Sequence, residues 1–242
     1  MAADQTPPFT ELMDTESKKH SKLRYAFVKN SFLDGLGSIR KDATVESIYT
    51  NNFRSSSSRL WYEAFVNLKK VVAGNPKQRT PNLKFAWFGS SRSEIANIIC
   101  NGFTRFDGGG QFSGSGVCLS PMEYSVDSAL SAVPDENGVR HVLLCMVILG
   151  DTELVQPGSV QSRPSSDEFE SGVDDISNPR RYIIWAPNIN SHICPKFVIS
   201  FKLANSAAAP PRIQQPKPPP INVLSMKPLG SLWFGNWKLG AK

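Results

Sequence analysis

The stretch FAWFGSSRSEIANIICNGF, residues 85–103, decides the fold of this chain. It opens in an apolar run that predicts a strand over 83–88. A helix is expected from Ser93 to Gly102, because Ser93 can accept a hydrogen bond from a free amide at a helix start and Gly102 can adopt the left-handed conformation that ends a helix. One face of this helix carries isoleucines: Ile95, Ile98 and Ile99.

Further strands are predicted after this unit. GSGVCLSPMEY (114–124) follows a glycine-rich loop, and RRYIIWAPN (180–188) contains an apolar strand. HVLLCMVILG (141–150) is almost continuously apolar, which is typical of a strand buried on both faces. KFVISFKL (196–203) alternates and predicts the last strand. Polar and acidic residues 156–179 are expected to form an excursion between strands.

The amino-terminal part is predicted to add one strand and two helices. LRYAFVKNSFL (23–33) is rich in aromatic residues and alternates loosely, so it predicts a strand. Asp42 is expected to cap a short helix that carries Val45 and Ile48. Steps of four, three and four residues predict a longer helix with one buried face: Trp61, Phe65, Leu68 and Val72. Many strands with few helices predict an α+β domain with a largely antiparallel core.

Three regions are expected along the 242 residues, of which 40% are apolar. Residues 1–20 are predicted to be a disordered leader, because they lack hydrophobic periodicity. Residues 21–205 are long enough for one domain with a core. Residues 206–242 begin as a proline-rich linker, consistent with an extended polyproline conformation, and end in a tail too short to form its own core.

The chain is basic, with a formal net charge of +6. The densest basic run could be a solvated tail or a nuclear-targeting or binding segment, and both interpretations stay open: Lys18, Lys19, Lys22 and Arg24. Nucleic acid is not the expected partner, because the aromatic residues are spaced as core residues and no recognition motif is present. No apolar run reaches the length of a membrane span.

The four cysteines do not form a C-x-x-C pair: Cys100, Cys118, Cys145 and Cys194. Each lies among apolar residues and no secretory signal precedes them, so reduced thiols that pack as small apolar side chains are expected. His192 is close to Cys194, but no second pair completes a zinc site, so no metal is predicted.

The segments 85–103, 114–124 and 180–188 together resemble the catalytic core of poly(ADP-ribose) polymerases. Over roughly residues 20–205 the chain is similar to the plant family of radical-induced cell death one and similar-to-RCD-one proteins. LRYAFVKNSFL and the long stretch RRYIIWAPNINSHICPKFVISF carry this resemblance. It implies the ADP-ribosyltransferase fold, also called the PARP catalytic-like fold, for residues 21–205.

The resemblance also identifies three positions at which active polymerases carry histidine, tyrosine and glutamate. This chain has Phe88, Cys118 and Arg181 there. A phenyl ring cannot make the hydrogen bond that the histidine makes to NAD⁺, and a thiol cannot stack as a phenol does. Arg181 reverses the charge that stabilises the cationic transition state. No catalytic residue is therefore expected.

A vestigial NAD pocket is implied by the same resemblance, with these contacts: Gly89, Ser90 and Ser125. The serine and tyrosine that hold nicotinamide in active relatives correspond to Val126 and Ala129 if no gap is allowed. A shift of one residue gives Ser125 and Ser128 instead, and both alignments stay open.

Each replaced position has a structural and a functional interpretation. Phe88 either fills the old pocket or reshapes it for another ligand. Cys118 is either a buried apolar residue or a reactive thiol. Arg181 either points to solvent and pairs with the acidic excursion, or grips a phosphate or a partner.

The resemblance implies an inactive regulatory protein that acts in the nucleus, in stress and developmental responses, through protein–protein interaction. Transcription factors are bound in that family by a helical RST domain, which residues 206–242 are too short to contain, so it is expected to be truncated or absent. The alternative is an unorthodox mono-ADP-ribosyltransferase that uses Glu123 or an acidic residue within 167–175. Only this alternative requires a cofactor, NAD⁺.

Overall fold

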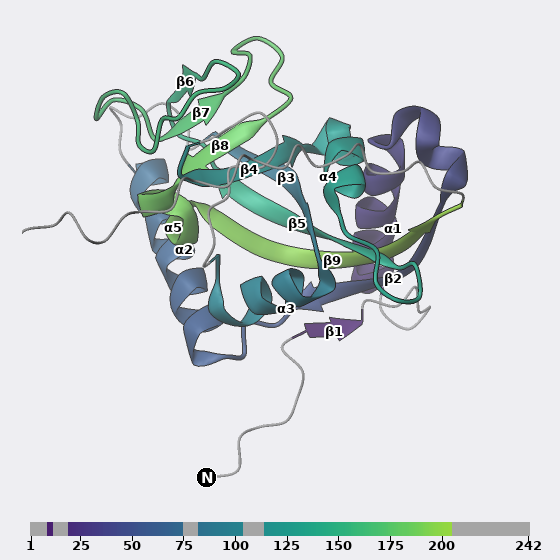
Figure 1. The fold of residues 1–242 in the computed structure, drawn as a ribbon. Helices are drawn as coiled ribbons and strands as arrows, with labels where there is room; N and C mark the ends of the chain where they lie inside the picture. The colour runs from purple at the N-terminus through teal and green to yellow at the C-terminus, as the bar shows by residue number, and fades with distance from the viewer. Residues whose placement is uncertain (1–8, 12–18, 75–81, 104–113, 205–242) are drawn as a thin grey trace, which may run out of the picture. The chain divides into compact units, whose positions relative to one another are not determined.

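The computed structural model describes residues 9–11, 19–74, 82–103 and 114–204 (Figure 1). All of them belong to one compact unit, Met1–Pro211. The expected linker and tail at 206–242, and most of the glycine-rich loop before 114, lie outside the described residues.

The described strands form a nine-stranded sheet in the order β1-β2-β9-β5-β3-β4-β8-β7-β6. Neighbouring strands are antiparallel except for the β6–β7 pair. The expected α+β class with a largely antiparallel core is therefore confirmed. The strands are β1 (Phe9–Glu11), β2 (Ala43–Asn51), β3 (Leu83–Ser90), β4 (Gly116–Pro121), β5 (Arg140–Ile148), β6 (Thr152–Leu154), β7 (Ser171–Val173), β8 (Tyr182–Trp185) and β9 (Ile193–Leu203).

Helices cover both faces of this sheet (Figure 1). They are α1 (Lys19–Asp34), α2 (Ser56–Gly74), α3 (Arg92–Asn101), α4 (Ser125–Ser131) and α5 (Ile189–His192), with short 3₁₀ helices η1 (Gly37–Asp42), η2 (Met122–Tyr124) and η3 (Ala186–Asn188).

Strand β5 divides the interior into two cores. Leu143 and Cys145 pack in the core that contains the isoleucines of α3. Val142 and Leu144 pack in the opposite core, against α1 and α4. All four side chains are fully buried. The expectation that this strand is buried on both faces is confirmed.

The segment 23–33 is a helix, so the predicted strand is wrong. Tyr25, Val28 and Phe32 face the core from α1, and Leu36 continues that face just beyond the helix end. Their spacing of three, four and four residues is helical. The strand pattern arose because Phe27, on the other side of α1, is also apolar although it is 45% exposed.

Residues 43–51 form strand β2, so the predicted helix is also wrong, and Asp42 ends the 3₁₀ helix η1 instead of capping an α-helix. Val45 and Ile48 both face the core that contains α1. Their odd spacing is possible in a strand because a bulge between Val45 and Ser47 leaves Glu46 out of the backbone register with β9, although its carboxylate pairs with Lys202 of that strand at 3.1 Å. A bulge has no clear sequence signal, so the spacing imitated a helix.

The other predicted strands and the helix over 61–72 are confirmed with shifted boundaries, but Trp61 of its expected buried face is 37% exposed, and the expected excursion 156–179 contains a strand, β7. Helix α3 begins at Arg92, one residue earlier than expected, because the capping residue is Ser91 and not Ser93: the Ser91 hydroxyl accepts the hydrogen bond from the Glu94 amide at 3.2 Å. Gly102 ends α3 with a φ of +76°. Within the expected disordered leader, β1 pairs with β2, so these three residues are ordered.

Candidate functional site

Strands β3, β4 and β8 lie side by side and carry the three replaced positions. Phe88 lies near the end of β3, Cys118 lies in the middle of β4, and Arg181 immediately precedes β8. Cys118 is paired with Ile183 across β4 and β8. The fold therefore brings these three chain segments together, as the resemblance implies. The side chains of Phe88 and Cys118 nevertheless pack in different clusters.

The Phe88 ring packs inside the protein. It is half-buried and makes an edge-to-face contact with Phe103, with ring centroids 5.2 Å apart. Phe103 is itself fixed by Asn190, whose Oδ1 accepts a hydrogen bond from the Phe103 amide at 3.0 Å and whose Nδ2 donates to the Phe103 carbonyl at 3.3 Å. This arrangement supports the interpretation that Phe88 fills space.

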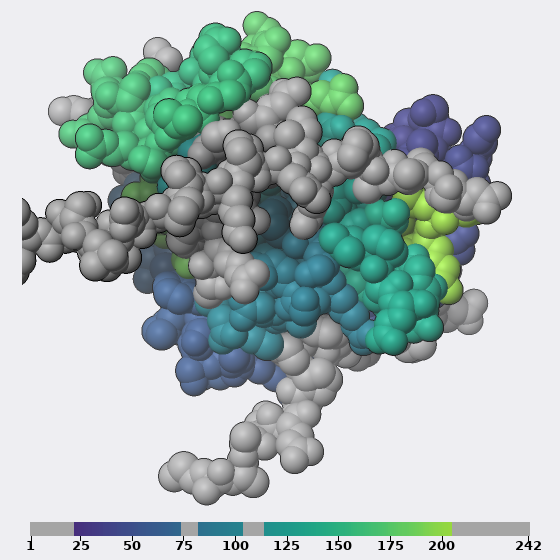
Figure 2. All heavy atoms as spheres, in the orientation of Figure 1, coloured from purple at the N-terminus to yellow at the C-terminus, as the bar shows by residue number. Residues whose placement is uncertain are grey.

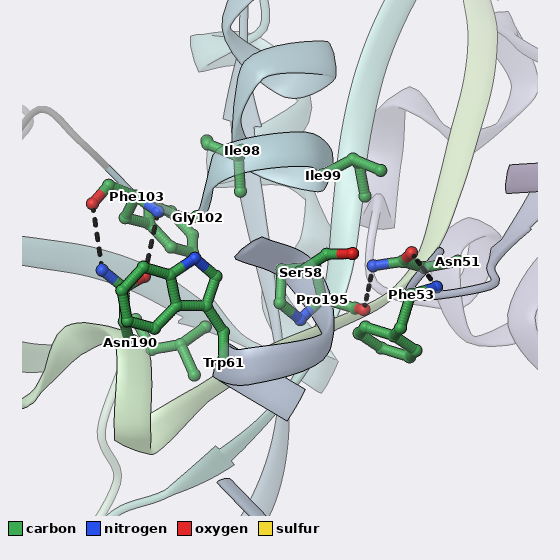
Figure 3. Close-up of a pocket in the computed structure, with 11 residues that line it drawn as sticks. Asn51, Phe53, Ser58, Trp61, Ile98, Ile99, Gly102, Phe103, Asn190 and Pro195 are labelled. Carbon is green, nitrogen blue, oxygen red and sulfur yellow. Dashed lines mark hydrogen bonds between the residues drawn. The ribbon is translucent and has the colours of Figure 1, made fainter. Parts of the chain in front are cut away.

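A small hollow lies beside Phe103, where α3 ends (Figure 3). Trp61 of α2 donates its indole N–H to the Asn101 carbonyl at 3.0 Å, and the Ser55 hydroxyl donates to the Cys100 carbonyl at 2.7 Å. The last carbonyl groups of α3 thus have hydrogen-bond donors. The hollow has a volume of about 20 Å³, which holds one water molecule and not a nucleotide.

Cys118 lies in an apolar setting. Its half-buried side chain packs against Val155, Ile183 and Trp185. Burial raises the pKa of this thiol to about 12, and the opposing effect of the nearby Arg181 charge is smaller. The reactive form of cysteine is the thiolate, which is scarce at neutral pH when the pKa is raised. These features favour a packing role.

Three cysteines should therefore resist alkylation in the folded protein. Burial raises the pKa of Cys118, of Cys145 and of Cys194, the last to about 11. We expect iodoacetamide at neutral pH to modify these thiols at least about tenfold more slowly than in the unfolded chain. Peptide mass spectrometry over time, with a denatured sample as control, measures the rates. Fast modification of native Cys118 would instead support the reactive-thiol interpretation.

The arginines before β8 are held by carboxylates. Asp174 Oδ1 accepts the backbone amides of Arg180 and Arg181, each at 2.9 Å. Arg180 also makes a bidentate pair with Asp127 of α4, at 2.9 and 3.1 Å, and its guanidinium lies 5.1 Å from the Tyr124 ring centroid. The pair with Asp127 raises the pKa of Arg180. The entry to β8 is thus tied to α4.

Helix α4 occupies the place where either alignment puts the nicotinamide contacts. Ser125 is fully buried and donates to the Phe32 carbonyl of α1 at 2.6 Å, and the Ser128 and Ser120 hydroxyls are 2.9 Å apart. In the other alignment, Ala129 is fully buried and Val126 packs on the same core. The Ser125 hydroxyl would have to leave Phe32 to contact a ligand, so a nicotinamide contact there stays a prediction.

Gly89 and Ser90 lie where β3 meets α4 and β5. A Cβ atom on Gly89 would be 1.8 Å from the Ser128 carbonyl oxygen, so the Gly89 backbone is covered by α4. The carbonyl of half-buried Ser90 accepts the Val133 amide at 3.2 Å. Ser90 and Gly89 are paired with β5 along their backbones. Their predicted contact with NAD⁺ stays a prediction.

His141 of β5 lies between Ser90 and Ser200 on the neighbouring strands. Its Nδ1 is 2.9 Å from the Ser200 hydroxyl, and its Nε2 is 3.7 Å from an Asp135 carboxylate oxygen. Burial lowers the pKa of His141, and Arg92 acts in the same direction, while Asp135 opposes both. No sequence motif marks this histidine.

This lowered pKa predicts loss of stability in acid. The unfolded chain binds a proton on His141 near its usual pKa of 6.5, whereas the folded protein does so only at lower pH. The free energy of unfolding should therefore fall as the pH drops from about 7 to about 5. In urea titrations, the decrease in the free energy of unfolding between pH 7 and pH 5 should be smaller for His141→Gln than for the natural chain. Part of the decrease that remains comes from His192, because burial lowers its pKa too. Equal decreases in both proteins would contradict this.

The carboxylates of the catalytic alternative differ in exposure: Glu170 and Asp174 are half-buried, and burial raises the pKa of Glu170, whereas the others are exposed. Glu123 is exposed on η2, and Asp167 and Glu168 are exposed in the excursion. Within the described ranges, no group of three or more histidine, cysteine, aspartate or glutamate side chains is placed to hold a metal ion. In the same residues, no helix has the length and apolarity to cross a membrane.

The family is established by comparison. The family profile described as "Poly(ADP-ribose) polymerase catalytic domain" matches residues 50–201, and this chain belongs to that family. The match begins at the end of β2 and extends into β9, so it includes all three replaced positions.

Within this family, the curated relatives that the chain matches are SRO proteins. It is 40% identical over 181 residues to "Probable inactive poly [ADP-ribose] polymerase SRO2" of Arabidopsis thaliana, covering 72% of this chain and 56% of that protein. It is 36% identical over 179 residues to SRO5 of the same plant, named in the same way, covering 70% and 56%. The expected resemblance is confirmed. The chain spans about half the length of these relatives.

A solved structure agrees. The PARP domain of Arabidopsis RADICAL-INDUCED CELL DEATH1 matches with a TM-score of 0.66 and 30% identity, covering 74% of this chain and 98% of that one. The expected PARP catalytic-like fold is therefore confirmed.

Proposed function

We propose that this chain is an inactive ADP-ribosyltransferase-like regulatory protein that acts through protein–protein interaction. The observation that carries the proposal is the position before β8, where Arg181 replaces the glutamate of active polymerases. Two unit charges 4 Å apart interact by roughly 4 kcal/mol at an effective dielectric near 20, so reversing one charge turns stabilisation of a cationic transition state into repulsion. The names of the relatives, as probable inactive polymerases, support the same conclusion.

The neighbourhood of α4 supports it independently. The Ser125 hydroxyl donates its hydrogen bond to the Phe32 carbonyl, and the Ser128 carbonyl lies against Gly89. A nicotinamide ring needs hydrogen-bonding groups and space, and in the described arrangement the Ser125 hydroxyl is engaged with Phe32 and the Cβ side of Gly89 is filled by α4. The engaged Ser125 hydroxyl, the covered face of Gly89 and the replaced positions Phe88 and Arg181 therefore argue against binding of NAD⁺.

A second candidate is an unorthodox mono-ADP-ribosyltransferase, for which exposed Glu123 is the specific observation. Incubation of the full chain with labelled NAD⁺ tests both candidates. We expect no NAD⁺-dependent label on the protein. Label that disappears in Glu123→Gln but persists in the matched exposed variant Glu136→Gln would overturn the proposal in favour of this enzyme.

Reintroduced polymerase residues provide a second test. The double variant Phe88→His, Arg181→Glu replaces two of the three positions but leaves α4 unchanged. We expect it to bind NAD⁺ no better than the natural chain, because the Ser125 hydroxyl remains bound to Phe32. Micromolar NAD⁺ binding by this variant would mean that the pocket was lost only through those two side chains.

We further propose that the protein acts in the nucleus, in plant stress and developmental responses, with transcription factors among its partners. The basic run near the start of α1 and the Arabidopsis relatives support this setting. Because the chain spans about half of those relatives, binding of transcription factors depends on whether residues 206–242 replace the RST domain. Co-purification of the chain with tagged transcription factors, with and without residues 206–242, tests this binding. We expect capture that depends on these residues, and no capture by either form would contradict the proposal.

A further inference from the structure

One segment of the fold exposes large apolar side chains on a protruding part of the molecule. The 151–179 segment, which contains β6 and β7, leaves Val160 79%, Ile176 58% and Leu154 48% exposed. The neighbouring Val155 and Val173 are buried. In Figure 1 the segment is the group of green loops and strands labelled β6 and β7 at the upper left, on the opposite side of the view from α1, and Figure 2 shows its atoms in the same place.

The topology starts the loops that carry Val160 and Ile176 at one end of the β6–β7 pair. Strands β6 and β7 are parallel, with Leu154 opposite Val173. The segments that follow two parallel strands leave the sheet at the same end. Val160 follows β6 and Ile176 follows β7, so both loops start beside Leu154. Exposed apolar side chains that lie close together mark interaction surfaces more often than isolated ones do.

The charge of the 151–179 segment limits what can cover these side chains. It carries seven acidic residues and one basic residue, Arg163, and thus a net charge of −6 in a chain whose net charge is +6. The acidic residues are Asp151, Glu153, Asp167, Glu168, Glu170, Asp174 and Asp175. Glu153 is buried, Glu170 and Asp174 are half-buried, and the other four are exposed.

Among the described residues, no ion pair within 4.0 Å uses these acidic side chains, although the Asp174 charge acts on nearby Arg180. Between described residues, the ion pairs within 4.0 Å join other acidic groups, such as Asp127 to Arg180 and Asp135 to Arg92. Asp174 and Asp175 instead accept backbone amides. These bonds shape the loop but do not neutralise the carboxylates. A covering partner should therefore be cationic.

The segment is held in shape by its own hydrogen bonds. Buried Glu153 accepts the Gln161 side-chain amide at 2.8 Å and the Ser165 backbone amide at 2.9 Å. Ser171 donates to the Leu149 carbonyl at 2.6 Å. Such bonds fix the loop before any partner arrives and reduce the entropy lost on binding.

We propose that the 151–179 segment is a docking surface for a cationic peptide segment of a partner protein that carries two or more apolar side chains. The proposal rests on the proposed function, in which the chain acts by protein–protein interaction. The apolar side chains of the partner pack on Val160, Ile176 and Leu154, and its lysine or arginine residues face the acidic side chains.

Fluorescence anisotropy with defined peptides tests this. The probe is a labelled 12-residue peptide with four lysines and two leucines, and its controls replace the lysines by glutamate or the leucines by serine. We expect the full chain to bind the probe and neither control. The variant Val160→Ser, Ile176→Ser should weaken binding at least about fivefold. The matched variant Leu60→Ser, Val71→Ser, with 61% and 65% exposed side chains on α2, should not. Added salt should weaken binding further.

Equal binding by the two double variants, or equal binding of the serine-substituted peptide, would overturn the docking surface. So would sedimentation showing that the chain instead associates with a second copy through Val160 and Ile176. The labelling test with NAD⁺ is separate: a failed peptide test with no labelling contradicts only the docking surface, whereas labelling contradicts the proposed inactive function whatever the peptides do.

Discussion

Replacement of Gly89 by alanine should lower the free energy of unfolding by about 3 kcal/mol or more. The added Cβ would lie 1.8 Å from the Ser128 carbonyl oxygen, which is far inside contact distance. The obstructing atom belongs to the backbone of α4, so no side-chain rotation relieves the clash and β3 must separate from α4. Overpacking that requires a backbone shift costs about 1–3 kcal/mol and sometimes more. For a domain of this size, thermal denaturation should show a decrease in Tm of roughly 6–12 °C.

Ser90→Ala is the matched control, because it changes the adjacent residue and keeps the Ser90 carbonyl that accepts the Val133 amide. It should change the Tm by only a degree or two. A Gly89→Ala protein as stable as this control would mean that α4 does not cover Gly89, and that the position retains the space a nicotinamide ring requires.

Replacement of Ser125 by alanine should lower the free energy of unfolding by about 1–3 kcal/mol. Ser125 is fully buried, and its hydroxyl is the donor to the Phe32 carbonyl at 2.6 Å. Removal of the donor leaves that carbonyl buried with one fewer partner, which costs more than the net contribution of an ordinary hydrogen bond. Urea unfolding measures the change.

The matched control is Ser131→Ala, at the other end of α4. Ser131 is exposed, and its hydroxyl donates within the helix to the Asp127 carbonyl at 2.8 Å. Its loss should cost less than about 0.5 kcal/mol, since water can replace the bond. Equal losses for the two serines would contradict a structural role for Ser125 and would favour its assignment to a ligand site.

The sequence predicted most of the central sheet because its strands are marked by apolar runs. HVLLCMVILG is apolar at almost every position, and β5 is buried on both faces as expected. The two wrong elements had misleading local patterns. Exposed Phe27 made α1 resemble a strand, and the bulge at Glu46 gave β2 the spacing of a helix.

The replaced positions could be identified from the motifs, but their surroundings could not. Asp127 and Arg180 are 53 residues apart, and Asn190 contacts Phe103 across 87 residues. Neither pair has a local signal, because the residue types are common at surfaces and turns. The hydrogen bond from Ser125 to Phe32 of α1 could not be predicted either. It depends on where α1 packs, and the sequence predicted a strand in place of that helix.

The measurement that tests the central claim most directly is calorimetric titration of the full chain with NAD⁺, after circular dichroism has shown that the protein is folded. An inactive polymerase-like protein, with Arg181 at the glutamate position and α4 against Gly89, should give only the heat of dilution. Saturable heat with a Kd in the micromolar range, lost in Ser125→Ala and kept in Ser131→Ala, would contradict the account and show that the pocket still binds its original ligand.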